Sequence, residues 1–350
     1  MSGDWNPNEL LGTQLGSCVL ERTLGVGGMG AVYLAQQIRP RRQVAVKVLQ
    51  PGRSAGSQAW QVFLERFRRE ADIAAGLDHA NIVPIYEFGE DGDIAFLVMP
   101  YLPDGSLSDL LLQAGRLPLS DALTYTEQVA AALDYAHAHA LVHRDVKPSN
   151  LLLHADGRLM LADFGIACSV DDTASGATPR AEESGTATGS ALPAGTPEYM
   201  APEQVRGGGV TPATDIYALG IVTYAMLTGE TPFGGVAPHM ILARQLHEPP
   251  PSVRTLRPDL SQRLDETLNW ALAKDPVARP QSALSFARAL RSAAARSHPL
   301  SGLFARSGAV QAPRGMLKMA SSLTGRPGRS SLVASHVPSS SPIAARRSSR

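Results

Sequence analysis

A glycine cluster near the amino terminus has the spacing of a phosphate-binding loop. Gly25, Gly27 and Gly30 follow the pattern G-x-G-x-x-G, and Gly28 adds a further glycine. Because glycine has no Cβ, the backbone N–H groups of such a loop can approach phosphate oxygens closely. A dinucleotide-binding turn would open a helix and be followed about 20 residues later by an acidic residue. Here strand-like residues follow Gly30 and residues 31–64 contain no Asp or Glu, so the pattern favours a hairpin over phosphates and excludes that turn.

A lysine and a glutamate beyond this hairpin form a candidate ion pair. Lys47 lies in a stretch that alternates like a strand, and residues 58–77 have the apolar spacing of an amphipathic helix. Glu70 follows Phe67 by three residues and therefore lies near the apolar face of this helix. A carboxylate there is costly unless it is paired, and we assign Lys47 as its cation. Glu65 falls on another face and is expected to be solvated.

Three further motifs follow in the second half of the chain. They are HRDVKPSN at 143–150, DFG at 163–165 and APE at 201–203. Together with the glycine cluster and VAVK at 44–47, in this order and at this spacing, they resemble a eukaryotic-type serine/threonine protein kinase of the bacterial branch. The resemblance covers about residues 18–292.

This resemblance implies an α+β, bilobal protein-kinase fold. The N-lobe, residues 18–99, is expected to be a small antiparallel β-sheet with one main helix, and the C-lobe, residues 103–292, to be larger and helical. Residues 1–17 form an N-terminal extension. Further strands are predicted at 82–90 and 94–102, a short helix after PDGSL and a long Ala-rich helix at 121–140.

The resemblance also assigns catalytic roles, which suit phosphoryl transfer because that reaction depends on positioning and charge neutralisation. Asp145 would accept the proton of the substrate hydroxyl, and Lys147 would contact the γ-phosphate of ATP. Asn150 and Asp163 would hold Mg²⁺, with Mn²⁺ as an alternative. Lys47, paired with Glu70, would contact the α- and β-phosphates. Asp215, and Arg279 paired with Glu203, match scaffold residues of the family.

The nucleotide pocket is likewise implied by the resemblance. Met99 would be the gatekeeper, and residues 100–102 would form the hinge that binds adenine through backbone groups. Pro100 departs from the glutamate common at its position, but adenine needs only its carbonyl and the N–H of Leu102. The residues assigned to nucleotide binding are Leu24, Gly25, Gly27, Gly28, Gly30, Val32, Ala45, Lys47, Met99, Pro100, Leu102 and Leu152.

The segment between DFG and APE carries candidate regulatory residues. Arg144 is the kind of cation that pairs with a phosphate on this loop and orders it. We expect activating autophosphorylation at Thr186, Thr188 or Ser190. Thr196 in GTPEYMAPE, like Lys147, matches the serine/threonine rather than the tyrosine subfamily.

Charge divides the chain into an acidic body and a basic tail. The 32 basic and 32 acidic residues balance overall, but residues 291–350 hold ten Lys or Arg and no Asp or Glu. The tail at 297–350 is rich in Ser, Arg and Pro and is expected to be disordered, with anionic partners as an open option. The longest apolar run, Ile216 to Leu227, is shorter than the ~18 residues of a membrane span, and the two cysteines are too few for a disulfide framework. The expected location is the cytoplasm.

The sequence thus predicts an ATP- and Mg²⁺-dependent kinase of the non-specific serine/threonine class that acts on proteins and on itself. A nucleotide-binding pseudokinase scaffold is the alternative; it is disfavoured because Lys47, Glu70, Asp145, Asn150 and Asp163 are all present. A small-molecule kinase of the same fold is a weaker alternative, because APE and Thr196 match protein kinases.

Overall fold

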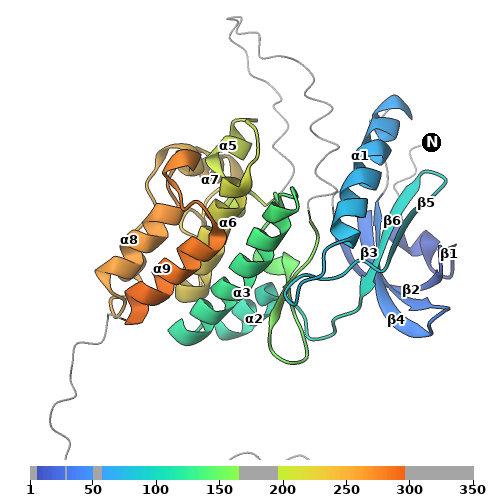
Figure 1. Cartoon of the computed structure of the whole chain (residues 1–350), viewed down its shortest axis with the longest axis horizontal. Coiled ribbons are helices and arrows are strands. Elements are labelled where there is room, and N and C mark those ends of the chain that lie inside the picture. Colours follow the sequence, from blue (N-terminus) through green and yellow to red (C-terminus); the bar gives the residue numbers. More distant parts are fainter. Residues whose placement is uncertain (1–5, 28–29, 50–56, 165–195, 296–350) are drawn as a thin grey trace, which may run out of the picture. The chain divides into compact units, whose positions relative to one another are not determined.

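The computed structural model describes residues 6–27, 30–49, 57–164 and 196–295 (Figure 1). Gly28, the three candidate phosphorylation sites before Thr196, and the basic tail at 297–350 lie outside the described residues. In the described part of the chain, no helix combines the length and the apolar content needed to cross a bilayer.

The N-lobe contains a six-stranded sheet in which every neighbouring pair is antiparallel, as predicted. The strand order is β1-β2-β3-β4-β6-β5. The strands are β1 (Gln14–Leu15), β2 (Cys18–Gly27), β3 (Gly30–Gln37), β4 (Arg42–Leu49), β5 (Glu87–Asp91) and β6 (Ile94–Pro100).

Part of the N-terminal extension joins this sheet. A 3-10 helix at Pro7–Leu10 precedes β1, and Tyr33 Oη donates a 2.8 Å hydrogen bond to the carbonyl of Pro7. Gln14 pairs with Val19 in the β1–β2 ladder. The described residues before Cys18 therefore extend the sheet by one edge strand.

The alternation of β4 determines which way Lys47 points. Val44, Val46 and Val48 belong to one buried cluster, whereas Ala45 and Leu49 belong to the cluster that also contains residues of helix α1. Successive side chains of a strand point to opposite faces, so Lys47 shares the face of Ala45 and Leu49. The sheet thus presents the lysine on the same side as α1.

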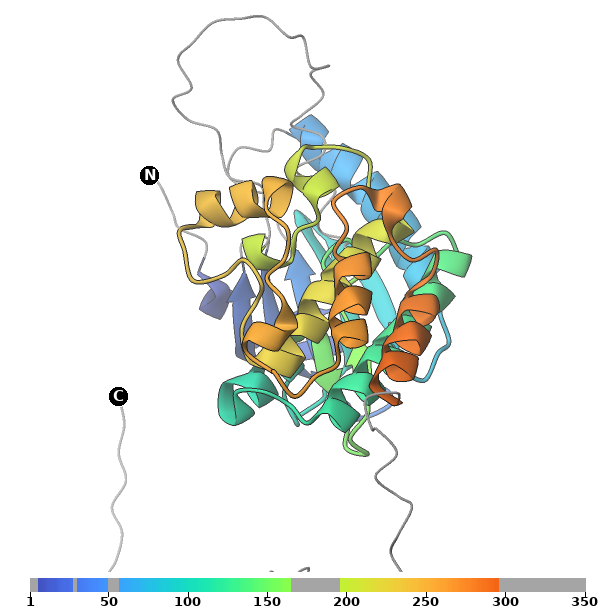
Figure 2. The same cartoon turned by 90° about the vertical axis from the view of Figure 1, so that its left-hand side faces the viewer.

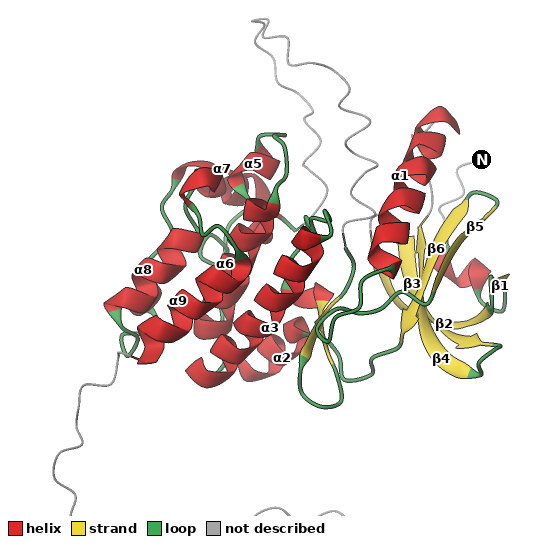
Figure 3. Ribbon diagram, viewed as in Figure 1, coloured by secondary structure: helices red, strands yellow, loops and turns green. Residues whose placement is uncertain are grey.

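Helix α1 (Ser57–Ala75) lies against the sheet (Figure 3). Aromatic side chains contribute to the contact between them. Phe63 stacks between Trp60 and Phe67, with ring centroids 4.7 and 6.1 Å away. Phe67 meets Phe88 of β5 edge-on at 6.3 Å. These contacts fix the rotation of the helix and hence the position of Glu70, one turn beyond Phe67.

The strand predicted at 82–90 begins later than expected. Within this stretch the strand is Glu87–Asp91, Tyr86 N–H still donates to Val98 of β6 at 2.7 Å, and residues 82–85 lie outside the sheet. Val83 N–H donates to the carbonyl of Leu161 at 2.9 Å, and Ile82 forms an isolated bridge with the same residue. Pro84 has no N–H to donate to a ladder, so this apolar stretch connects the two lobes instead of extending the sheet.

The described part of the C-lobe is helical, apart from a small hairpin. Helices α3, α6, α8 and α9 lie side by side (Figures 1 and 2), and α6 is buried along nearly its whole length, so the apolar run Ile216–Leu227 is a core helix. The helices are α2 (Leu107–Ala114), α3 (Leu119–Ala138), α5 (Pro202–Val205), α6 (Pro212–Thr228), α7 (Pro238–His247), α8 (Gln262–Ala271) and α9 (Ala283–Ala295). The 3-10 helices are Pro148–Asn150, Pro197–Tyr199, Val253–Thr255 and Pro276–Ala278, and the hairpin strands are β7 (Leu151–Leu153) and β8 (Leu159–Leu161).

Polar side chains cap the N-termini of helices α2 and α9. Ser106 caps α2, and its hydroxyl and the Asp109 carboxylate form a capping box. Asp134 of α3 caps α9 across the lobe, because its carboxylate accepts from the N–H groups of Ala283 and Leu284 at 2.8 and 3.0 Å. The Ser106 hydroxyl and the Asp134 carboxylate thus accept from helix N–H groups that have no partner within their own helix.

Candidate active site

The glycine cluster lies on a β-hairpin, as its pattern predicts. Gly25 pairs with Val32, and Gly27 pairs with Gly30, across β2 and β3. Gly30 has φ +150°, and a Cβ added there would lie 1.9 Å from the carbonyl oxygen of Val48, so this position requires glycine. The hairpin confirms that the cluster does not open a helix, which removes the dinucleotide-binding alternative.

Most residues assigned to the adenine pocket meet in one hydrophobic cluster. Ala45 and Met99 are buried and face each other in the β4–β6 ladder. Val32, Leu102 and Leu152 are partly buried and pack against the same cluster, and Leu24 on β2 is 36% exposed. Pro100 is the last residue of β6 and pairs with Val44 there, so the chain leaves the sheet directly after Pro100.

Lys47 and Asp163 meet, although they are 116 positions apart in sequence. Lys47 Nζ lies 3.1 Å from Asp163 Oδ1, and both side chains are partly exposed, at 20% and 27%. Asp163 has φ +60°, a left-handed conformation uncommon for residues other than glycine. The lysine of β4 and the aspartate that follows β8 therefore face a common site, as the resemblance implies.

Glu70 pairs with a different cation from the one predicted. Glu70 Oε1 lies 3.4 Å from Arg144 Nη1, and within the described ranges no ion pair joins Glu70 to Lys47. The predicted Lys47–Glu70 pair is therefore wrong for this structure. The physical argument behind it holds, because a partly buried carboxylate needs a cation, and here Arg144 supplies it. Glu65 is exposed, as expected.

The loop at 143–150 brings three polar side chains together. Lys147 Nζ lies 2.7 Å from Asp145 Oδ2. Asn150 donates its amide N–H groups to the backbone carbonyl and to Oδ2 of Asp145, at 2.8 and 3.1 Å. The six residues 145–150 therefore bring the base candidate, a cation and an amide into one hydrogen-bonded group, and within the described residues the side-chain Oδ1 of Asn150 is left for another partner.

A buried histidine connects this loop to the DFG segment. His143 is fully buried, and its Nε2 lies 2.9 Å from the carbonyl oxygen of Ala162. Because a carbonyl only accepts, Nε2 donates, and Nδ1 is then free to accept from the N–H of Asp145 at 3.2 Å. The ring also contacts Phe164, with centroids 4.9 Å apart.

Asp215, in the first turn of α6, holds the backbone of the same loop through hydrogen bonds. Its two carboxylate oxygens accept from the N–H groups of His143 and Arg144, both at 2.8 Å, and Oδ2 also contacts His137 Nε2 at 2.7 Å. Arg144 has φ +70°, so these contacts hold a residue in a left-handed conformation directly before Asp145. The sequence identified Asp215 as scaffold, and its contacts show which backbone groups it supports.

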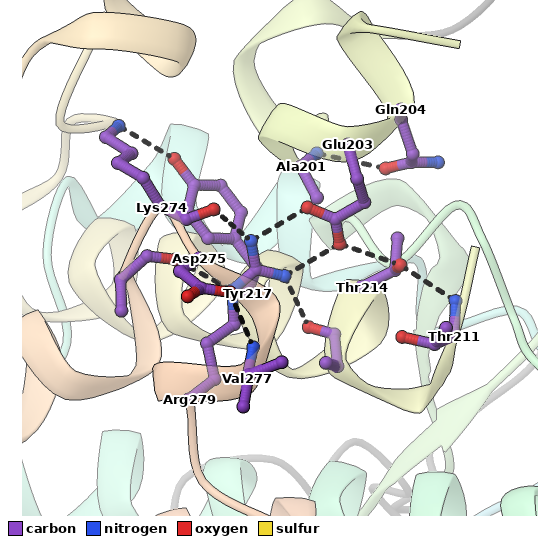
Figure 4. Close-up of polar contacts among 12 residues, drawn as sticks. Ala201, Glu203, Gln204, Thr211, Thr214, Tyr217, Lys274, Asp275, Val277 and Arg279 are labelled. Carbon is purple, nitrogen blue, oxygen red and sulfur yellow. Dashed lines mark hydrogen bonds and ion pairs between the residues drawn. The ribbon is translucent and has the colours of Figure 1, made fainter. Parts of the chain in front are cut away.

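Glu203 and Arg279 form a buried ion pair that fixes the APE segment (Figure 4). Arg279 donates to both Glu203 oxygens, at 2.7 and 2.8 Å, and Thr214 Oγ1 donates to Glu203 at 2.9 Å. Burial alone would raise the pKa of Glu203. The hydrogen bonds that Arg279 donates, together with its positive charge, outweigh the effect of burial, so the pKa of Glu203 is lowered. The pair that the resemblance implies is thus present.

One polar residue of the site was not predicted. Gln204, directly after the APE motif, donates to the carbonyl of Arg144 at 2.9 Å and accepts from the N–H of Ala201 at 3.0 Å. The available signal was its place at the third position of a short helix that begins with proline. The regulatory candidate Thr196 precedes this helix and its carbonyl accepts from Tyr199 N–H at 3.1 Å.

Comparison with known proteins agrees with this geometry. The protein kinase domain family matches residues 18–291. The chain is 39% identical over 262 residues to serine/threonine-protein kinase PrkC of Bacillus subtilis, covering 75% of this chain and 38% of PrkC. It is 41% identical over 280 residues to PknJ of Mycobacterium tuberculosis, covering 78% and 45%, and 39% identical over 285 residues to PknA of the same species, covering 80% and 62%.

The chain therefore spans about two fifths to three fifths of the length of these relatives, and the shared part is the kinase domain. The matched residues 18–291 include both lobes and all five motifs. This chain belongs to the protein kinase domain family, in its bacterial serine/threonine branch.

Proposed function

We propose that this protein transfers the γ-phosphoryl group of ATP to serine or threonine hydroxyls of proteins. The observation that carries the proposal is the 3.1 Å contact between Lys47 and Asp163, beside the Asp145–Lys147–Asn150 group. The relatives named above are serine/threonine-protein kinases, which supports the choice of acceptor. The cytoplasm, where ATP is available, is the compartment we expect.

The donor chemistry of Asn150 and Asp163 fits a divalent cation. The amide nitrogen of Asn150 is committed to Asp145, which leaves its carbonyl oxygen as a ligand, and Asp163 offers carboxylate oxygens. Mg²⁺ prefers oxygen ligands and keeps several waters, so two protein ligands are enough; Mn²⁺ suits the same donors. When bound, such a cation neutralises charge on the nucleotide phosphates.

The side chains of the loop at 143–150 have separate roles in the transfer. Asp145 accepts the proton of the attacking hydroxyl as the new phosphate ester bond forms and the bond to ADP breaks. Lys147, 2.7 Å from Asp145, supplies positive charge where the transferred group carries negative charge. Lys47 binds phosphate oxygens from the side of the sheet.

We also propose activation by autophosphorylation at Thr186, Thr188 or Ser190. Arg144 supports this proposal because its Nε is buried without a hydrogen-bond partner in the part of the chain that the structure describes. A phosphate oxygen is a strong acceptor for a guanidinium group and would satisfy this donor.

The test is transfer of labelled γ-phosphate from ATP to the chain and to a generic protein substrate. Asp145→Asn should lower the rate by about 10²-fold or more, because a positioned base is lost. Asp156→Asn is the matched control, since Asp156 is exposed in the β7–β8 turn and contacts Arg158 and His154 there. Label should map to one of the three loop residues.

Three results would count against the proposal. Nucleotide binding by the wild type without any transfer would favour the pseudokinase scaffold. Equal activity of Asp145→Asn and wild type would remove the assigned base. Transfer to small molecules with none to protein would favour a small-molecule kinase.

A further inference from the structure

Gln204 connects the APE segment to the catalytic loop through both ends of one amide. Its Oε1 accepts from the backbone N–H of Ala201, the N-cap residue of its own helix, at 3.0 Å. Its Nε2 donates to the backbone carbonyl of Arg144 at 2.9 Å, sixty residues earlier in the chain. A side-chain amide is both donor and acceptor, and here each function serves a different segment.

The first of these contacts has a simple structural explanation. Gln204 is the third residue of helix α5 (Pro202–Val205), and its oxygen accepts from the N-cap residue as in half of a capping box. Glutamate serves this purpose as well as glutamine does. Helix capping therefore accounts for the Oε1 contact, and it does not account for the donor contact to Arg144.

The donor contact acts on the peptide group that precedes the base. The carbonyl of Arg144 and the N–H of Asp145 belong to the same planar peptide unit. Gln204 holds the oxygen of this unit, and His143 Nδ1 accepts from its N–H at 3.2 Å. Hydrogen bonds at both its C=O and its N–H thus fix the orientation of the peptide plane between Arg144 and Asp145.

The residue before Asp145, Arg144, has an energetically unfavourable backbone conformation. Arg144 has φ +70°, and such a conformation persists only where surrounding contacts hold it. Asp215 holds its N–H at 2.8 Å, and Gln204 holds its carbonyl at 2.9 Å. Asp215 reaches the loop from α6, whereas Gln204 reaches it from the segment that contains Thr196 and Glu203.

We propose that Gln204 is a positioning residue for Asp145, and that its Nε2–H donation couples the order of the segment 196–203 to the orientation of the base. The inference rests on the proposed kinase function. Gln204 acts through the backbone of Arg144 and does not itself contact the reacting groups.

Gln204→Glu separates positioning from capping. The carboxylate still accepts from Ala201 N–H, but it has no N–H to donate and it repels the Arg144 carbonyl oxygen. We expect kcat for phosphate transfer to fall about tenfold, the KM for ATP to change less than about twofold and the melting temperature to change by less than about 3 °C. If Gln204 only caps α5, all three quantities stay at wild-type values.

Gln128→Glu is the matched control for the added charge. Gln128 Oε1 accepts from Leu159 N–H at 2.8 Å, and a carboxylate keeps this contact. This variant should retain wild-type kcat. An equal loss of kcat in Gln128→Glu and Gln204→Glu would attribute the effect to charge and overturn the proposal.

A double-variant cycle with Asp145→Asn gives a readout that a purely structural role would not change. If Gln204 acts by orienting Asp145, Gln204→Glu should cost little further activity once the base is absent, because the two residues act as a unit. Equal fold-losses in the wild-type and Asp145→Asn backgrounds would refute the inference. Gln204→Met, which removes the donor without adding charge, repeats the cycle if Gln204→Glu folds poorly.

The same measurements separate this inference from the proposed function. Absence of transfer by the wild type would reject the function. Transfer by the wild type, its loss in Asp145→Asn and its retention in Gln204→Glu would reject only the role of Gln204.

Discussion

The guanidinium of Arg279 uses all five of its N–H groups within the fold. Two bonds go to Glu203, and the others go to the backbone carbonyls of Ala273, Ala213 and Lys274, at 2.7 to 3.2 Å (Figure 4). The Arg279 side chain is fully buried and that of Glu203 is 10% exposed. Arg279→Lys keeps the charge and removes this geometry, so it tests how much the five-donor fork contributes.

The size of the effect follows from counting donors. A lysine ammonium has three N–H groups, so at least two of the five acceptors lose their bond. Each buried acceptor left without a partner costs about 1–3 kcal/mol, so two of them give about 2–6 kcal/mol for Arg279→Lys. Arg279→Met also leaves the Glu203 charge without its cation, and breaking a buried pair in this way costs about 3–5 kcal/mol.

Thermal and urea unfolding of the purified chain measure these losses. A loss of 1 kcal/mol shifts the melting temperature by roughly 2–4 °C in a domain of similar size, so Arg279→Lys should melt about 10 °C lower. Arg291→Lys is the control, because Arg291 makes a similar two-bond pair with Glu127 at the surface, where the side chains are 46% and 35% exposed. An exposed pair contributes about 0–1 kcal/mol. Equal shifts for the two lysine variants would refute the reasoning.

The pH dependence of the same variants provides a second check. The pKa of Glu203 is lowered in the folded protein, so the pair stabilises above the ordinary glutamate pKa, and this stability is lost as pH falls through the folded value. In Arg279→Met, burial, the largest influence on Glu203, is opposed only by hydrogen bonds from Thr214 and the backbone, so the pKa of Glu203 should rise and favour its protonated form. The stability difference between wild type and variant should therefore narrow as pH falls from 7 towards 4. A difference that is constant over this range would contradict the assignment.

Two further predictions concern the partly buried Lys274 and the glycine hairpin. Burial, with repulsion by Arg279, lowers the pKa of Lys274 to about 8, so the folded protein loses this proton before the unfolded chain does, and the free energy of unfolding should rise between about pH 8 and 10.5. Lys274→Met should flatten this rise in urea unfolding measured at pH 7.5 and 9.5; an unchanged rise would show that another group causes it. Gly30→Ala should lower the melting temperature, because the added Cβ meets a carbonyl oxygen at 1.9 Å, whereas Gly25→Ala meets no atom within 4 Å and should melt like the wild type. Equal melting of the two alanine variants would contradict the steric argument.

The features that the sequence predicted well depend on local periodicity or on motif spacing. Alternation in β4 was enough to predict that Lys47 lies on the face opposite to Val46. The apolar spacing of α1 was enough to predict that Glu70 is partly buried. Asp145 and Asn150 are five residues apart, so one loop had to present both. In each case the relevant geometry is contained within a few residues of chain.

The features that the sequence did not predict depend on contacts between distant segments. The apolar stretch from Ile82 was expected to continue a strand, but its partner is Leu161 in the other lobe. Gln204 follows the APE motif at a helix start, and the composition of that helix does not reveal that the amide nitrogen faces Arg144. A hydrogen bond across sixty residues is determined by the packing of the two segments, which no local pattern encodes.

The pairing of the charged residues at the site shows the same limit in energetic terms. Lys47 and Arg144 are cations, Glu70 and Asp163 are carboxylates, and the structure pairs Lys47 with Asp163 and Arg144 with Glu70. All four side chains are 17–27% exposed, so water screens each contact and the alternative pairing also satisfies every charge. Burial requires that each carboxylate has a cation, and this requirement follows from the sequence. Which cation it has depends on the difference in free energy between alternative pairings, and motif spacing does not determine that difference.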